Sequence, residues 1–262
     1  MKNAWKLFLL IFLLGLSSAH SAESNVAVPI LVYHRLGPVV ADSMTVKTSD
    51  FASLLAYLDS NGYTVIPLRR LVGYLAGNEA APPERTVVIT ADDGHESVYT
   101  EMFPLIRRYH IPVTLFIYPS AISNASYAMT WQELREMQDS GLVDIESHTY
   151  WHPNFNREKK RLEKRDYQQF VTMQLAKSKI TLEHKLDKHV DMLAWPFGIY
   201  DDELIDYARN RGYIAGFTLQ RRPAERSDNP LAFPRYLMTD QVNYKKLLSE
   251  AMHANHNSKS KP

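Results

Sequence analysis

The sequence predicts an α/β protein whose simplest architecture is a distorted (β/α) barrel of seven or eight parallel strands. Short apolar runs alternate with stretches of helical periodicity along most of the chain, and repeated strand–helix units build a parallel sheet wrapped by helices. The length of 262 residues also suits an α/β barrel that forms one domain. An open doubly wound sheet is the alternative, but the glycine-rich phosphate fingerprint of that fold is missing after the first apolar run.

The expected strands are short runs rich in β-branched and aromatic residues. In chain order they span residues 29–33, 63–67, 86–90, 113–118, 143–146, 191–195, 213–218 and 233–237. Polar or turn-forming residues follow directly after several of these runs. In a barrel, catalytic groups gather at the carboxyl ends of the strands, so these positions are the first place to look for a site.

The expected helices lie between those strands. They span residues 48–60, 97–109, 130–140, 158–185, 201–211 and 243–252, with a further helical stretch after residue 67. The helix 48–60 has one apolar face and stops at Gly62. Thr130 and Glu133 form the sequence pattern of a capping box. The segment 158–185 is long and polar, and a break within it is left open.

The first residues have the pattern of a secretory signal peptide. Lys2 and Lys6 precede an apolar run at residues 7–16, and small residues follow, with cleavage expected after Ala19 or Ala22. An uncleaved membrane anchor is the alternative. We therefore divide the chain into a signal peptide (residues 1–22), one catalytic domain (residues 23–253) and a polar, disordered tail (residues 254–262). The expected location is outside the cytoplasm, either periplasmic or extracellular.

Charge and cysteine content restrict the function further. The formal net charge of +1 gives no long-range field that would attract nucleic acid. The chain has no cysteine, which excludes a lipoprotein anchor and disulfides. Any metal site must therefore use histidines and carboxylates.

Two adjacent carboxylates, Asp92 and Asp93, follow the apolar run 86–90 and precede Gly94. Burying both is costly unless a metal or another cation pairs with them. One carboxylate could bind a metal while its neighbour accepts a proton. The alternative is an ordinary Asp-Gly turn.

Two histidines, His148 and His152, follow the run 143–146. One turn of helix would place both imidazoles on the same side, as a shared metal requires; the alternative is two unrelated histidines. Residues 195–198 (Trp-Pro-Phe-Gly) could aim a backbone N–H at a ligand, but alone they are best explained as a structural loop. Together, the carboxylates and histidines match a metal site with positions open to water and substrate.

The order Asp-Asp-Gly, His-Thr-x-x-His and Pro-aromatic-Gly resembles the polysaccharide deacetylases, also called NodB-homology domains or carbohydrate esterase family 4. Residues 109–116 are similar to the family segment after the first motif, and residues 131–141 to the helix before the second. The resemblance covers residues 29–237. It implies a metal-dependent hydrolase of linear amides that removes N-acetyl groups from a polysaccharide.

The resemblance also implies a role for each matching residue. Asp93, His148 and His152 would bind a divalent metal, usually zinc. Asp92 would be the general base for a metal-held water that attacks the acetyl carbonyl, and the backbone N–H of Phe197 would stabilise the oxyanion.

The chain departs from the family pattern at several positions. Ala91 stands where a Phe usually precedes the carboxylate pair, which affects packing more than chemistry. Ala194 stands where the family has the Arg that orients the base, and Arg235 could assist Asp92 in its place or could be structural. The usual Leu-x-His motif near the C-terminus, whose His is the general acid, has no convincing match.

The first expected strand instead ends in Tyr33-His34-Arg35. Together with residues 194–198 (Ala-Trp-Pro-Phe-Gly), this is similar to the branch that acts on poly-β-1,6-N-acetylglucosamine, the biofilm polysaccharide. The resemblance implies that His34 is the general acid, a task that suits a side chain titrating near neutral pH. The alternative is a buried structural histidine.

The favoured function is thus N-deacetylation of poly-β-1,6-N-acetylglucosamine. Deacetylation of peptidoglycan, chitin or xylan is the alternative, as is a catalytically idle carbohydrate-binding protein of the same fold. We expect a monomer that binds no nucleic acid. Polysaccharide synthesis or export proteins would be separate chains.

Overall fold

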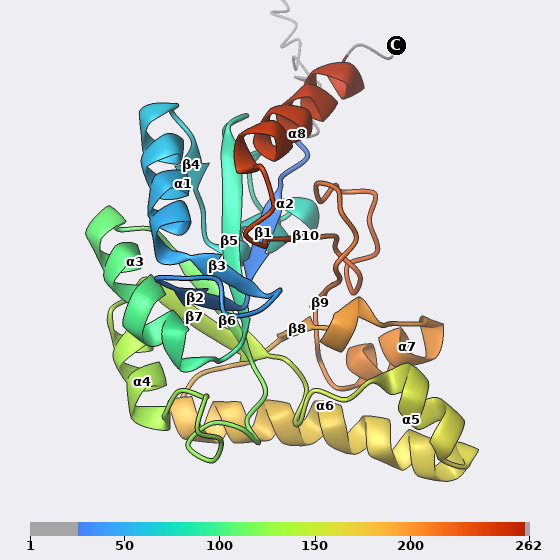
Figure 1. Ribbon diagram of the computed structural model, residues 1–262. Coiled ribbons are helices and arrows are strands. Elements are labelled where there is room, and N and C mark those ends of the chain that lie inside the picture. The colour runs from blue at the N-terminus through green and yellow to red at the C-terminus, as the bar shows by residue number, and fades with distance from the viewer. Residues whose placement is uncertain (1–25, 260–262) are drawn as a thin grey trace, which may run out of the picture.

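The computed structural model describes residues 26–259, so the expected signal peptide at residues 1–22 lies outside the described residues. At its centre is a curved parallel sheet with the strand order β10-β1-β5-β6-β7-β8-β9, and β4 pairs with β5 beside this path (Figure 1). The strands are β1 (Ile30–Tyr33), β4 (Thr64–Val65), β5 (Thr86–Asp93), β6 (Val113–Ile117), β7 (Val143–Ser147), β8 (Met192–Ala194), β9 (Ala215–Phe217) and β10 (Tyr236–Leu237).

The two ends of this sheet nearly meet. Phe217 of β9 forms a parallel bridge with Phe233, which lies just before β10. The N–H of Thr218 donates to the Phe233 carbonyl at 2.8 Å, and the N–H of Phe233 donates to the Gly216 carbonyl at 2.7 Å. The predicted distorted barrel is therefore confirmed, with seven strands along its main path.

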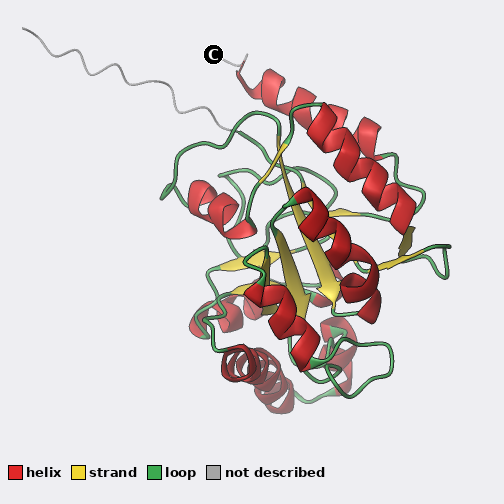
Figure 2. Cartoon of the chain, turned by 90° about the vertical axis from the view of Figure 1, so that its left-hand side faces the viewer, coloured by secondary structure: helices red, strands yellow, loops and turns green. Residues whose placement is uncertain are grey.

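Helices surround the strands, as Figure 2 shows. They are α1 (Thr48–Ser60), α2 (Leu68–Leu75), α3 (Phe103–Tyr109), α4 (Trp131–Asp139), α5 (Phe155–Arg161), α6 (Lys164–Leu186), α7 (Asp202–Asn210) and α8 (Tyr244–Lys259), with a π-helical turn at Val98–Met102 and a 3₁₀ turn at Pro196–Gly198. In Figure 1, α6 runs along the bottom of the molecule and α8 along the top.

Two helical segments differ from the sequence prediction, and a third settles a point that the sequence left open. The helix expected at 97–109 begins as a π-helical turn and continues as α3, and the segment 158–185 is indeed broken, with Leu162 ending α5 in extended conformation. The last helix continues past residue 252 to Lys259, so most of the tail expected to be disordered is helical backbone. No glycine or proline interrupts the sequence there before Pro262.

The alternation of side chains along the strands divides the core into two layers. Leu31, Ile89 and Leu115 face outward and pack in one cluster beneath the surrounding helices. Ile30 and Val88, their neighbours in sequence, face the opposite side and pack in the second cluster. This period of two is what a strand buried on both faces requires.

One join in the sheet is made by a side chain rather than by backbone. β7 and β8 share only the register pair Ser147 with Leu193. The N–H groups of Asp191 and Met192 donate instead to the carboxylate of Glu146, at 3.0 and 2.9 Å. Glu146 is fully buried. Its carboxylate satisfies these two backbone N–H groups at a point where β7 and β8 have no second register pair.

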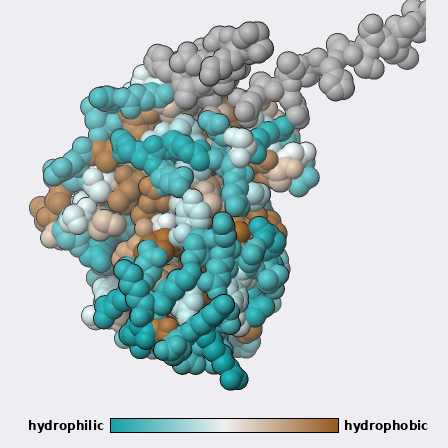
Figure 3. Space-filling view, turned by 90° about the vertical axis from the view of Figure 1, so that its right-hand side faces the viewer, coloured by the Kyte–Doolittle hydropathy of each residue, from teal (hydrophilic) through white to brown (hydrophobic). Residues whose placement is uncertain are grey.

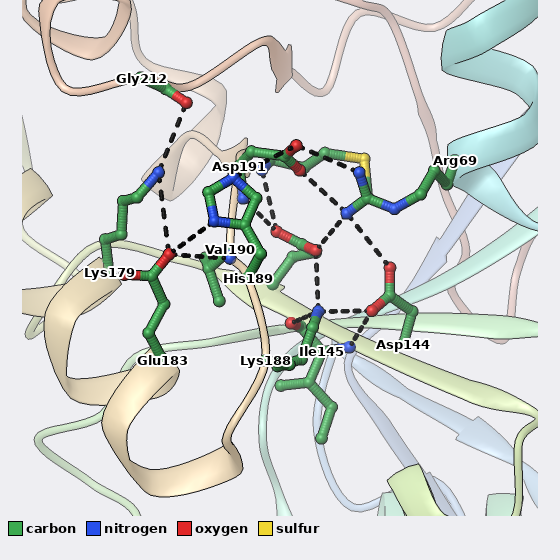
Figure 4. A network of polar contacts seen from close by, with 12 residues as sticks. Arg69, Asp144, Ile145, Lys179, Glu183, Lys188, His189, Val190, Asp191 and Gly212 are labelled. Atoms are coloured by element: carbon green, nitrogen blue, oxygen red, sulfur yellow. Dashed lines mark hydrogen bonds and ion pairs between the residues drawn. The ribbon is translucent and has the colours of Figure 1, made fainter.

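Cations complete the seam, as Figure 4 shows. Arg69 of α2 donates to Glu146 at 2.8 Å and to Asp191 at 2.9 Å. Lys188 donates to Glu146 at 2.9 Å and to the Ile145 carbonyl at 2.6 Å. Burial raises the pKa of Glu146 to about 7, although Lys188 and the Met192 N–H oppose that rise. The contacts of this network hold β7 beside β8.

The face presented in Figure 3 is mostly hydrophilic in its lower part, with hydrophobic residues scattered through its middle. Across the described range, no helix has both the length and the apolar character needed to cross a bilayer.

Candidate active site

Three predicted metal ligands meet at the carboxyl ends of the strands. Asp93 is the last residue of β5, His148 follows β7 directly, and His152 lies in the loop after it. One ligand atom from each lies within 4.8 Å of the others. The Nε2 atoms of His148 and His152 are 3.5 and 3.6 Å from Asp93 Oδ1.

The histidines converge by a route that the sequence prediction got wrong. Residues 148–152 are a loop, not a turn of helix. Thr149 and His152 adopt left-handed backbone conformations, with φ of 64° and 59°, and the N–H of His152 donates to Thr149 Oγ1 at 3.2 Å. Pro153 disfavours the right-handed helical conformation at the residue before it, so the loop reverses direction to aim both rings at Asp93.

The electrostatics of these residues fit a divalent cation. Asp93 Oδ1 is buried and has no hydrogen-bond partner among the described residues. Burial and the neighbouring Asp92 raise the pKa of Asp93, while burial lowers the pKa of His152 and brings that of His148 to about 3. Two neutral imidazoles and an unsatisfied carboxylate oxygen are a donor set suited to zinc and similar metals.

The outer contact of His148 sets its orientation. Its Nδ1 lies 2.8 Å from the carbonyl oxygen of Ala194, at the end of β8. A carbonyl can only accept, so Nδ1 carries the proton and Nε2 presents its lone pair toward Asp93. This second contact is typical of metal-binding histidines, and it depends on the β7–β8 spacing that Glu146 maintains.

Asp92, the predicted base, is paired with Arg235. The guanidinium donates through Nη1 to Asp92 Oδ1 at 2.8 Å and through Nη2 to Oδ2 at 2.7 Å. Burial alone would raise the pKa of Asp92, but Arg235 and His148 outweigh it and lower the pKa to about 2. Arg235 therefore orients Asp92 where the family's usual Arg is replaced by Ala194. Of the two interpretations of Arg235, assistance to Asp92 or a structural role, the structure supports the first.

His34 lies against the same centre. It is buried after β1, and its Nδ1 has no hydrogen-bond partner among the described residues. Burial lowers its pKa, and the charges of Asp92 and Asp93 oppose that change. A buried imidazole without a partner for Nδ1 has no evident structural task, so a role in the site is the better explanation.

Phe197 stands in a strained turn beside the candidate metal ligands. Its φ is 57° and its side chain is 56% exposed. The N–H groups of Gly198 and Ile199 are satisfied within the turn, by the carbonyls of Trp195 and Pro196. Within residues 26–259, the N–H of Phe197 has no hydrogen-bond partner, which leaves this group available to an oxyanion.

The sequence did not identify the aromatic ring contacts of His152. Its ring packs against Phe197 on one side, with centroids 4.6 Å apart, and Tyr118 on another, at 5.5 Å. Trp151 and Tyr127 stand close by and are 48% and 41% exposed. Aromatic residues are frequent throughout this sequence, so composition alone could not single these out.

Comparisons with known proteins agree with this geometry. Residues 79–216 match the family model described as polysaccharide deacetylase. A poly-beta-1,6-N-acetyl-D-glucosamine N-deacetylase of Staphylococcus aureus (strain MRSA252) is 26% identical over 202 residues, which are 76% of this chain and 69% of that protein.

Solved structures are similar as well. The structure of IcaB from Ammonifex degensii superposes with a TM-score of 0.77 and 25% identity, over 87% of this chain and 97% of that one. The Streptococcus pyogenes deacetylase PplD, solved in complex with acetate, has a TM-score of 0.76 and 22% identity, over 86% of this chain and 98% of that one. The second likeness concerns the fold alone.

Proposed function

The chain belongs to the polysaccharide deacetylase family, and from that premise we propose that it removes N-acetyl groups from poly-β-1,6-N-acetylglucosamine. The observation that carries the proposal is the convergence of Asp93, His148 and His152 beside the buried Asp92–Arg235 pair and His34. An idle sugar-binding protein would have no chemical need for this set of groups together. The hydrolase is therefore favoured over the binding protein.

A divalent metal, zinc in our proposal, would be held by Asp93, His148 and His152 and would supply Lewis acidity toward the acetyl carbonyl and the attacking water. Asp92 accepts the proton of that water. Arg235 holds both carboxylate oxygens of Asp92, so the base stays ionised and fixed in orientation.

The remaining groups act on the other side of the reaction. The N–H of Phe197 donates to the oxygen of the acetyl group as negative charge develops on it. His34 gives a proton to the leaving amine nitrogen, which converts a poor leaving group into a neutral amine. In the sheet, β5 and β6 separate β1, which His34 follows, from β7.

The choice of polysaccharide rests on likeness to named relatives. The Staphylococcus aureus relative is named for this polymer, and the early His34 and the Ala-Trp-Pro-Phe-Gly segment resemble the same branch. We also propose that the protein works outside the cytoplasm, as the pattern of residues 1–22 predicts.

The direct test measures acetate released by the purified protein from β-1,6-linked N-acetylglucosamine oligomers. We expect release that stops with a chelator and returns with zinc, and none from an Asp92→Asn variant that retains metal. His34→Ala should keep its metal and lose most of its turnover. Equal turnover in that variant would contradict the role of His34.

Substrate choice is tested in the same assay. Acetate from chitin, peptidoglycan or acetylated xylan, with none from the β-1,6 oligomers, would keep the reaction type and replace the polymer. No acetate from any of them, with zinc bound, would refute the hydrolase and favour the binding protein.

A further inference from the structure

A cavity of about 410 Å³ opens on the outer side of the sheet, between α1 and the loop 238–243 that joins β10 to α8. Its walls include Tyr33, Asp50, Asp240 and Tyr244. Its volume falls within the range of roughly 300–1,000 Å³ typical of small-molecule sites. Among the described residues that line it, none is a candidate catalytic group or metal ligand, so the proposed reaction leaves this cavity without a use.

Tyr33, the last residue of β1, reaches into this cavity from the sheet. It is only 2% exposed, and its ring packs edge-on against Phe51, with centroids 5.0 Å apart. Its hydroxyl has no hydrogen-bond partner among the described residues. A buried hydroxyl without a partner is costly, so an occupant that bonds this group is favoured.

Two carboxylates of the cavity are incompletely paired. Asp240 Oδ1 is buried and accepts no hydrogen bond from the described residues, and the Nζ of Lys47 lies 3.6 Å from it. Asp50 stands in the first turn of α1, where the helix N-terminus stabilises a negative charge, and it has no ion pair among the described residues. Lys245, the one cation among the described lining residues, holds its Nζ 5.5 Å from the centre of the Tyr57 ring. The cavity therefore offers acceptors that lack donors.

The loop that forms one wall is held in place before any ligand arrives. Its first N–H, from Met238, donates to the Val32 carbonyl of β1 at 2.9 Å. Within the loop, the Val242 N–H donates to the Thr239 carbonyl at 3.0 Å. A preformed site loses little entropy on binding.

The lining favours an organic cation. The carboxylates of Asp50 and Asp240 attract an ammonium group and accept its hydrogen bonds. Val46 and Met238 supply apolar surface for a hydrocarbon portion, and the ring of Tyr244 can also contact a cation. A bare metal ion would leave the apolar surface and most of the volume unused, and both carboxylates would repel an anion.

We propose that this cavity binds a small organic molecule through a primary ammonium group, held by the carboxylates of Asp50 and Asp240 and by the hydroxyl of Tyr33. The inference goes beyond the proposed function, because the site is separate from the groups assigned to hydrolysis. Tyr33 directly precedes His34 in the chain, so an occupant would contact the neighbour of the candidate general acid.

The test titrates the purified protein, with zinc added, by calorimetry with cyclohexylamine and with cyclohexanol. The two probes have nearly the same shape and differ in charge. We expect the amine to bind at least tenfold more tightly, the size expected for hydrogen bonds to a charged group. Titrations with putrescine and with glucosamine then distinguish a polyamine from an amino sugar as the source of the ammonium group. Equal affinity for cyclohexylamine and cyclohexanol would overturn the inference.

Matched variants place the binding in this cavity. Asp50→Asn and Asp240→Asn keep the shape and remove the charge, and Tyr33→Phe keeps the ring and removes the hydroxyl; each should weaken amine binding by about tenfold. Asp139→Asn makes the same charge change at an exposed position at the end of α4, outside the cavity, and should bind the amine as the wild type does. Urea unfolding confirms that each variant is folded. Undiminished amine binding in folded Asp50→Asn and Asp240→Asn would also overturn the inference. Acetate release is a separate measurement, and its failure would refute the proposed function while leaving this site in place.

Discussion

The pair formed by Asp92 and Arg235 provides the sharpest test of the site. Both side chains are almost completely excluded from solvent, with exposures of 2% and 0%. Removing one member of a buried ion pair typically costs about 3–5 kcal/mol, because the other charge stays buried without compensation. Replacing both members by neutral groups costs far less, since no unpaired charge remains.

We therefore expect Arg235→Met to lower the free energy of unfolding by about 4 kcal/mol. The double variant Asp92→Asn/Arg235→Met should be more stable than the sum of its single variants predicts, by ~3 kcal/mol. Arg235→Lys should fall between, because one ammonium cannot bond both carboxylate oxygens at once.

Urea unfolding at pH 7 measures these differences, provided that a chelator is present in every sample so that metal binding does not add to stability. Acetate release and zinc content are measured on the same preparations. Arg235→Met should keep zinc and lose activity. Free energies that add within about 0.5 kcal/mol would show that the two residues are not energetically coupled, and the electrostatic explanation would be wrong.

Three further outcomes are expected. His148→Ala should lose both zinc and activity, as measured by metal analysis and acetate release, and an active, zinc-loaded variant would refute the ligand assignment. Gly216→Ala should destabilise the fold by about 3 kcal/mol in urea unfolding, because a Cβ there would lie 2.3 Å from the Leu231 carbonyl oxygen; near-normal stability would contradict the close approach. Burial alone would raise the pKa of Asp201, but its hydrogen bonds to Lys159 and to the N-terminus of α7 outweigh burial and lower the pKa. The charge of Asp201 therefore stabilises the fold above the unfolded pKa of ~3.9. This contribution is lost as pH falls through the lower pKa of the folded state. Asp201→Asn should thus be less stable than wild type by up to ~1 kcal/mol at pH 7 and equal to it near pH 2, and a difference independent of pH would point to the cap rather than the charge.

The sequence predicted the features that depend on local pattern. The helix Thr48–Ser60 has the predicted bounds because its apolar spacing and the Asn61-Gly62 stop are local signals. The capping box of Thr130 and Glu133 is present for the same reason. The order of the motifs was sufficient to predict that Asp93, His148 and His152 lie close together, because the carboxyl ends of parallel strands lie at one edge of the sheet.

Features that depend on distant or conformationally unusual residues were not predictable. The small parallel pair β2 (Arg35–Gly37) and β3 (Thr45–Lys47) was missed because each strand has only three residues. The left-handed conformation of the His152 loop has no sequence signal beyond Pro153. Arg235 could be suspected but not assigned, since 143 positions separate it from Asp92.

That separation has a consequence for the order in which the enzyme becomes competent. All three candidate metal ligands precede residue 153 in the chain, whereas Arg235 directly precedes β10, the last strand of the described residues. β10 docks beside β1, the strand that carries His34 at its end. A chain that ends before β10 thus lacks the counter-charge of Asp92, and one that ends before β8 also lacks the Ala194 carbonyl that orients His148. By this order, docking of the last strand completes the charge balance around Asp92.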